Sequence, residues 1–202
     1  MKNLKTKTLV DKELLRRKKM LNEPHILALS KYTKSLRNKN LGKIPDFDPL
    51  DGGTNAKILF LLEKPGPEVF GDRSYGFISR DNDDQSAAYT IEFMLEANIP
   101  RNITCSWNTI PGWDGKIKFT ADDERRGRNE IGNLLNLLPN LKVIVLVGQT
   151  AQRNFKRYQK DNSIDPKLKI IESYHPSPQV KRFNPDQHTN IPKKWAEAKQ
   201  YI

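Results

Sequence analysis

The sequence has one cysteine, Cys105, and three histidines among its 202 residues. A single cysteine excludes a disulfide within the chain, a cysteine-ligated metal site and an iron–sulfur cluster. The chain has no run of eighteen or more apolar residues, so we expect no membrane-spanning helix and no membrane partner. The first five residues, Met-Lys-Asn-Leu-Lys, do not begin an apolar stretch of the signal-peptide type. These absences predict an intracellular protein.

The positive charge of the chain is placed unevenly. Its 35 Lys and Arg residues exceed its 24 Asp and Glu residues by eleven. Residues 1–43 carry a net charge of +10, whereas residues 44–202 carry a net charge of only +1. A basic segment attracts polyanions such as nucleic acids through counterion release. The alternative is a solvated basic helix that keeps the protein soluble.

The charge and the loop signals divide the chain into two parts. Residues 1–43 are predicted to be a basic helical N-terminal extension, and residues 44–202 an α/β domain. The extension contains two predicted helices, over residues 8–20 and after Pro24. In the second part we predict helices over 85–97, from Asp122 or Asp123 to Leu138, over 150–158 and over 192–201.

The sequence predicts four strands, over residues 57–62, 103–107, 143–147 and 168–173. The uninterrupted apolar residues 58–62 are typical of a strand that is buried on both faces, and 143–147 is the clearest buried strand in the chain. Strands that alternate with helices indicate a parallel sheet covered on both faces. The predicted fold is therefore α/β, a three-layer α/β/α sandwich with a central, mainly parallel four-stranded sheet.

A residue suited to a functional site follows each predicted strand. These residues are Glu63, Asn108, Gly148 and His175. Because the carboxyl ends of parallel strands meet at one edge of a sheet, we expect the four residues to outline one site.

Each of these residues has a functional and a structural interpretation. The Glu63 carboxylate could activate a water, or it could cap a turn or pair with Lys64. The Asn108 amide could read the edge of a base, or it could be an ordinary turn residue. The His175 imidazole could hold charge that develops on a leaving group, although a lone histidine is more often structural.

Two further candidates lie in predicted turns and loops. Phe77, in the long loop 64–82, could stack on a planar ring or fold onto the core. Gly148 and Gln149 could offer backbone N–H groups to a phosphate, or they could form only a tight strand–helix turn. The run 81–84, Asp-Asn-Asp-Asp, lacks the spacing of a metal loop, and we interpret it as a turn and helix cap.

Four motifs, in order over about residues 56–183, resemble those of the uracil-DNA glycosylase superfamily. The first is Leu-Leu-Glu-Lys-Pro-Gly-Pro-Glu at 61–68, a strand followed by a Pro-Gly turn. Trp-Asn-Thr at 107–109 is similar to the strand-end asparagine of that family, and Val-Leu-Val-Gly-Gln-Thr-Ala-Gln at 145–152 to its third strand-to-helix turn. His-Pro-Ser-Pro at 175–178 is its last motif, present intact.

The resemblance implies a DNA glycosylase of base excision repair, which flips uracil or a related deaminated base out of DNA and hydrolyses its N-glycosidic bond. It implies that Glu63 positions a water and that His175 stabilises the departing base. Phe77 would stack on the base, with Tyr75 or Phe70 as alternatives. The other base-binding residues would be Asn108 and Gly66. The DNA backbone would contact Gly148, Gln149, Ser177, Gln179, Lys181 and Arg182.

The same resemblance implies no metal and no other cofactor, and we expect a monomer whose partner is DNA that contains a deaminated base. The sequence departs from the family pattern at two positions. Lys64 follows the acid where a small or uncharged residue is expected, and Gln179 occupies the position of the apolar wedge, which would then move to Val180 or Arg182.

These departures keep two other functions open. One is a non-catalytic nucleic-acid-binding protein on the same fold, which the basic residues 1–43 also favour. The other is a hydrolase or binder of small nucleotides that uses Gly148 as a phosphate turn.

Overall fold

The computed structural model describes residues 11–70 and 76–202. Its central sheet consists of β2 (Ile58–Leu62), β4 (Thr104–Asn108), β5 (Val143–Val147) and β6 (Lys169–Ser173). The strand order is β4-β2-β5-β6, and every neighbouring pair is parallel. All four predicted strands are confirmed, and each end lies within one residue of its predicted position.

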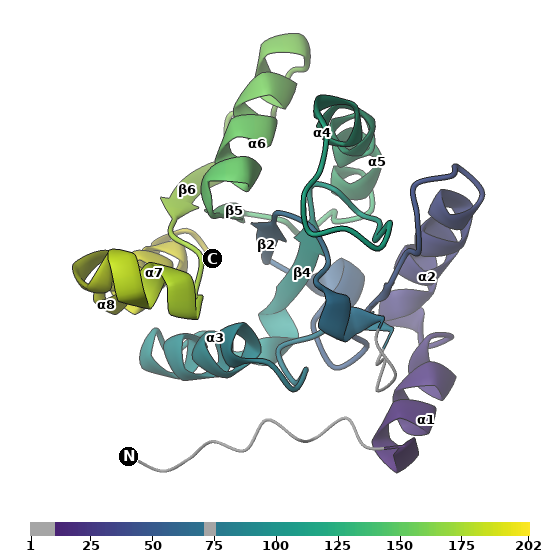
Figure 1. Cartoon of the computed structure of the whole chain (residues 1–202), viewed down its shortest axis with the longest axis horizontal. Coiled ribbons are helices and arrows are strands. Elements are labelled where there is room, and N and C mark those ends of the chain that lie inside the picture. The colour runs from purple at the N-terminus through teal and green to yellow at the C-terminus, as the bar shows by residue number, and fades with distance from the viewer. Residues whose placement is uncertain (1–10, 71–75) are drawn as a thin grey trace.

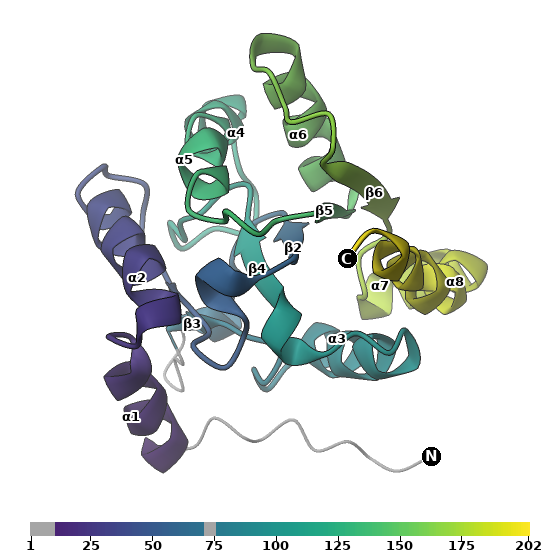
Figure 2. The same cartoon turned by 180° about the vertical axis from the view of Figure 1, so that it is seen from behind.

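Helices cover both faces of this sheet (Figures 1 and 2). They are α1 (Asp11–Met20), α2 (Pro24–Arg37), α3 (Gln85–Glu96), α4 (Ala121–Arg128), α5 (Ile131–Leu135), α6 (Gln149–Asp161), α7 (Pro178–Phe183) and α8 (Pro185–Ala196). Alternate side chains of each strand point to opposite faces. Leu59 and Leu61 pack with α2, α5 and α6, whereas Ile58 and Phe60 pack with α3 and α8. The fold is α/β, and its layers are compatible with the predicted three-layer sandwich.

The predicted helix over 122–138 is two helices. Thr120 caps α4 by accepting a hydrogen bond from the Asp123 N–H, with an Oγ1–N distance of 3.2 Å, and the Asp123 side chain bonds back to Thr120. The chain leaves the helical hydrogen-bond pattern after Arg128 and begins α5 at Ile131. Ile131, Leu134 and Leu135 of the predicted apolar face belong to this separate short helix, whereas Leu138 lies beyond its end.

The C-terminal helices begin earlier than the sequence predicts. We predict a start at Pro192, but α8 begins at Pro185 and contains Pro192. Proline is favourable at the first position of a helix, and the sequence offers two prolines for that role. Helix α7 was not predicted, although Ser177 followed by Pro178 is a typical helix start: Ser177 caps α7 by accepting from the Val180 N–H.

A small second sheet was also not predicted. It consists of β1 (Asp46–Phe47) and β3 (Phe77–Ile78), which pair in parallel. The Phe47 ring stacks on Trp107 of β4, with 3.9 Å between ring centroids. The small sheet therefore lies beside the β4 edge of the central sheet, and Phe77 belongs to a strand rather than to an open loop.

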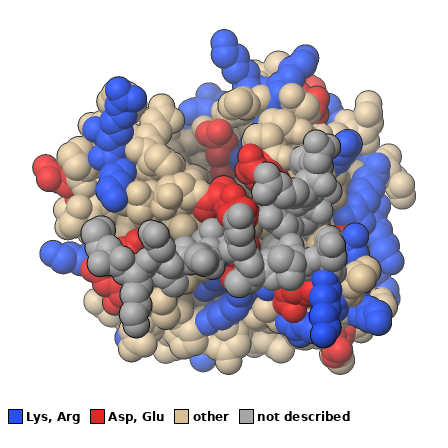
Figure 3. Space-filling view, turned by 60° about the horizontal axis from the view of Figure 1, so that its bottom comes forward, with Lys and Arg blue, Asp and Glu red and all other residues tan. Residues whose placement is uncertain are grey.

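The N-terminal helices belong to the core of the domain. Ile26, Leu29 and Leu36 of α2 are completely buried, in the same apolar cluster as Leu59 and Leu61 of β2. The described part of residues 1–43 therefore packs against the predicted α/β domain. Lys and Arg side chains gather along the outer side of the molecule near α1 and α2 (Figure 3).

Helix α1 is tied to the domain by a buried network of charged groups. Arg17 is only 2% exposed, and its guanidinium donates to Asp48 and Asp81 with N–O distances of 2.7 Å. Arg101 donates to the same two carboxylates at 2.6 and 2.7 Å. Buried charges are stable only when they are paired, so each carboxylate depends on both arginines.

Within the described residues, no helix combines the length and apolar character that crossing a membrane would require.

We expect Arg17→Ala to lower the free energy of unfolding by about 3 kcal/mol, because it removes one of the two cations that compensate Asp48 and Asp81. Lys18→Ala, at an exposed neighbouring position, is the control and should change it by less than about 0.5 kcal/mol. Urea unfolding of the two variants and the wild type measures both effects. Equal stability of the two variants would show that the ion pairs of Arg17 do not contribute to the free energy of unfolding.

Candidate functional site

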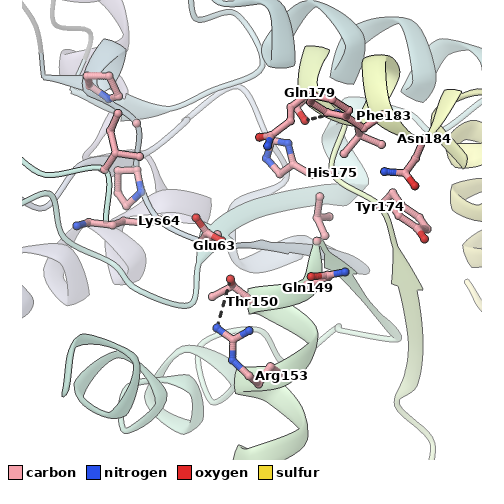
Figure 4. Close-up of a pocket in the computed structure, with 18 of the residues that line it drawn as sticks. Glu63, Lys64, Gln149, Thr150, Arg153, Tyr174, His175, Gln179, Phe183 and Asn184 are labelled. Carbon is pink, nitrogen blue, oxygen red and sulfur yellow. Dashed lines mark hydrogen bonds between the residues drawn. The ribbon is translucent and has the colours of Figure 1, made fainter. Parts of the chain in front are cut away.

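A pocket of about 540 Å³ lies at the carboxyl edge of the sheet (Figure 4). The last residue of β5, the loops that follow β2, β4 and β6, and residues of α6 and α7 line it. They include Glu63, Gly66, Val147, Gly148, Gln149, His175, Ser177 and Gln179. This volume is within the range of about 300–1,000 Å³ that is typical of ligand sites. Three of the four predicted strand-end residues therefore do meet around one pocket.

Glu63 is held at the pocket through its backbone. Its carbonyl accepts from the Ile110 N–H at 2.9 Å and from the Thr109 hydroxyl at 3.2 Å. Its side chain is half-buried and reaches toward the pocket (Figure 4). No hydrogen bond or ion pair within 11–70 and 76–202 involves its carboxylate. The carboxylate is therefore available to a water or a ligand.

The sequence left open an ion pair between Glu63 and Lys64, but Lys64 has other partners. Its ammonium donates to the Asp114 carboxylate at 2.6 Å and to the Lys116 carbonyl at 2.9 Å, and it lies 5.4 Å from the centre of the Trp113 ring. The hydrogen bond from Lys64 also lowers the pKa of Asp114. The unusual lysine thus fastens the loop over 113–116 and leaves Glu63 unneutralised.

His175 lies two residues beyond β6 and faces the pocket (Figure 4). Its carbonyl accepts from the Ser177 N–H at 2.8 Å, which shapes the turn into α7. Burial lowers the pKa of the imidazole to about 4, because the surrounding protein disfavours the charged form. Near pH 7 the ring is therefore neutral and has one N–H to donate and one nitrogen to accept.

Gly148 forms the turn from β5 into α6. Its φ angle is +88°, a left-handed conformation that residues with a Cβ rarely adopt. Its N–H donates to the Ser173 carbonyl at 2.8 Å, and no side chain caps the helix that follows. The first backbone N–H groups of α6 therefore start at the pocket wall, where an anion could accept from them.

The basic side chain on this wall is already paired. Arg153 of α6 forms an ion pair with the buried Glu124 of α4, to which Arg157 also donates at 3.0 Å.

Within the described residues, no group of three or more His, Cys, Asp or Glu side chains is arranged to hold a metal ion.

Two predicted base-binding residues lie outside the pocket. Phe77 is 1% exposed, and Asn108 is 6% exposed; neither lines the pocket. The Asn108 Oδ1 has no hydrogen-bond partner among the described residues. Both residues lie on the β4 side of the molecule, whereas the pocket opens over β2, β5 and β6. Of the alternative aromatics, Phe70 packs against the core and Tyr75 lies outside the described residues.

The predicted backbone-binding residues divide into two groups. Gly148, Gln149, Ser177 and Gln179 line the pocket, although the Ser177 hydroxyl is occupied as the cap of α7. Lys181 and Arg182 are exposed on α7 and do not line it. Lys181 lies 5.0 Å from the Tyr89 ring, and the Arg182 guanidinium lies 5.2 Å from the Phe183 ring.

The pocket residues that sequence reasoning missed include Tyr174, Phe183 and Asn184. The helix-start signal at Ser177-Pro178 would have placed α7 and its last residue, Phe183, next to His175.

The low pKa of His175 predicts a loss of stability in mild acid. Its pKa is about 4 in the folded protein and near 6.5 in the unfolded chain, so the unfolded state binds more protons between these pH values. The free energy of unfolding should therefore fall as the pH drops through this range, and His175→Gln should remove that contribution. Urea unfolding of both proteins at about pH 7 and about pH 4.5 measures it.

Asp51, whose pKa burial raises to about 6, titrates in the same range in both proteins and cancels in the comparison. Identical pH dependence of the wild type and the variant would contradict the burial of the imidazole.

No model of a known protein family matches the chain, and no curated protein sequence matches it. The resemblance to the uracil-DNA glycosylase superfamily therefore rests on the four motifs and their order. The pocket is a separate observation, because it was found from the positions of the residues in the structure and not from the motifs.

Proposed function

We propose that the protein is a DNA glycosylase that hydrolyses the N-glycosidic bond of uracil or a related deaminated base, on the fold of the uracil-DNA glycosylase superfamily. One observation carries the proposal: an unpaired carboxylate, Glu63, and a neutral imidazole, His175, line the same pocket at the carboxyl edge of the sheet. The four ordered motifs support it.

The two side chains suit the two sides of the scissile bond. The bond between the sugar C1′ and the base nitrogen breaks, its electron pair leaves with the base, and a water oxygen bonds to C1′. Glu63 would hold that water and accept its proton. The neutral His175 would donate its N–H to the oxygen of the base on which negative charge develops. A neutral imidazole keeps one N–H, so it can donate in this way near pH 7.

The structure also supplies groups for the base and for the backbone. Gln149 and Gln179 carry amide donors and acceptors on the pocket wall, where they could meet a base edge in place of Asn108. The uncapped start of α6 could donate its backbone N–H groups to a phosphate oxygen.

A second function is favoured by the positions of Phe77 and Asn108 outside the pocket. A protein whose pocket lacks these two base-binding residues could bind nucleic acid at the pocket without releasing a base. Binding that weakens steeply with salt, together with no base release, would identify this function.

The decisive experiment incubates the protein with single- and double-stranded oligonucleotides that contain uracil or another deaminated base, followed by alkaline cleavage at abasic sites. We expect cleavage by the wild type, and a rate at least about 100-fold lower for Glu63→Gln and for His175→Ala. Glu68→Gln is the matched control: it makes the same carboxylate-to-amide change at an exposed position outside the pocket, and it should keep the wild-type rate.

Absence of strand breaks for every deaminated base at high protein concentration would reject the glycosylase. Full activity of either pocket variant would reject the role given to that residue.

A further inference from the structure

The mouth of the pocket carries two exposed aromatic side chains. Phe183, the last residue of α7, is 65% exposed, and Tyr174, between β6 and α7, is 39% exposed. Both line the pocket (Figure 4). Neither ring belongs to the two apolar clusters that form the core. Aromatic rings that gather at a pocket mouth instead of packing inward are typical of a binding surface.

An amide lies between these rings. Figure 4 shows Asn184 between Phe183 and Tyr174, with its carboxamide toward the pocket. The Asn184 backbone is fixed, since its N–H donates to the Val180 carbonyl at 2.8 Å and its carbonyl accepts from the His188 N–H at 3.0 Å. Its side chain forms no hydrogen bond with the other described residues. Two rings and a free amide match a nucleobase, which has planar faces and an edge of donors and acceptors.

Cationic groups accompany these rings on the outer side. The Arg182 guanidinium lies 5.2 Å from the Phe183 ring, and Lys181 is exposed one residue earlier. A strand of nucleic acid alternates bases with negative phosphates, so rings beside cations suit a strand better than they suit an uncharged ligand.

We propose that Tyr174, Phe183 and Asn184 bind the nucleobase adjacent to the one that enters the pocket, and that the substrate is therefore single-stranded DNA. In a duplex the adjacent base stays stacked on its neighbours, and its faces are not available to protein rings. In a single strand the same base is free to stack on Phe183 or Tyr174. This inference rests on the proposed function, because it places the excised base in the pocket next to these rings.

The test measures binding of a fluorescent oligonucleotide of normal bases by anisotropy, as a single strand and as its duplex, at one salt concentration. We expect the single strand to bind at least about 10-fold more tightly than the duplex. Phe183→Leu, and separately Tyr174→Leu, keep apolar bulk but remove the ring, and each should weaken single-strand binding by about 5- to 100-fold. Phe183→Tyr keeps a ring and should bind like the wild type.

Leu95→Ala is the control for loss of exposed apolar surface, since Leu95 is 69% exposed on α3 and lies outside the pocket. It should leave binding unchanged. Because Phe183 and Tyr174 are exposed, their variants should melt at the wild-type temperature, and thermal unfolding checks this. Equal affinity for single strand and duplex, or wild-type single-strand binding by both leucine variants, would overturn the proposal.

The oligonucleotide contains no deaminated base, so this result does not depend on catalysis. Weak binding by the leucine variants without base release by the wild type would reject the glycosylase and keep the stacking site. Base release by the wild type together with unchanged binding by the leucine variants would reject the stacking site and keep the glycosylase.

Discussion

The pocket depends on the parallel pairing of β5 with its two neighbours. Leu61 of β2 lies opposite Leu146, and Ser173 of β6 lies opposite Val147, so the three strands end at nearly the same level. The residues that follow them, Glu63, Gly148 and His175, must therefore emerge at one edge. All five residues of the central strand β5 are apolar and buried, so the polar residues of the pocket follow this strand and do not interrupt it. The sheet thus fixes both where the polar residues begin and which of them become neighbours.

The sequence predicts the ends of the strands, because a buried parallel strand is a continuous apolar run that stops at the first polar residue. It does not predict the lateral order of the strands, which is set by packing between distant segments. In the observed order β4 lies at the edge beyond β2, away from β5 and β6. Asn108 ends β4, and Phe77 belongs to the small sheet beside β4, so both come to lie on the far side of β2 from the pocket. The predicted strand ends were correct, whereas the assumption that all four surround one cavity was not.

Charge misleads in a similar way at the N-terminus. Residues 1–43 carry nearly all the excess charge, which favours a basic segment that binds polyanions or stays solvated, yet Arg17 is among the most buried side chains of the molecule. Its partners Asp48 and Asp81 are 31 and 64 positions away in the sequence, so no local pattern distinguishes it from its exposed neighbours. Lys64 is a second example. Because Lys64 follows Glu63 in the sequence, an ion pair between the two is a natural expectation. Instead, Lys64 donates to Asp114, which lies 50 positions away in the sequence.

These long-range pairs decide the electrostatics of the pocket. Asp114 holds Lys64, Glu124 holds Arg153, and burial keeps His175 neutral, so the Glu63 carboxylate has no cationic partner there among the described residues. A carboxylate in this setting repels a phosphate but accepts hydrogen bonds from a water or an uncharged base. The start of α6, which could bind an anion, forms one wall of the pocket, and the cations of α7 lie outside the pocket lining. The Glu63 side of the pocket therefore suits the uncharged part of a nucleotide, while the start of α6 and the cations of α7 suit its phosphates, as the proposed base excision would need.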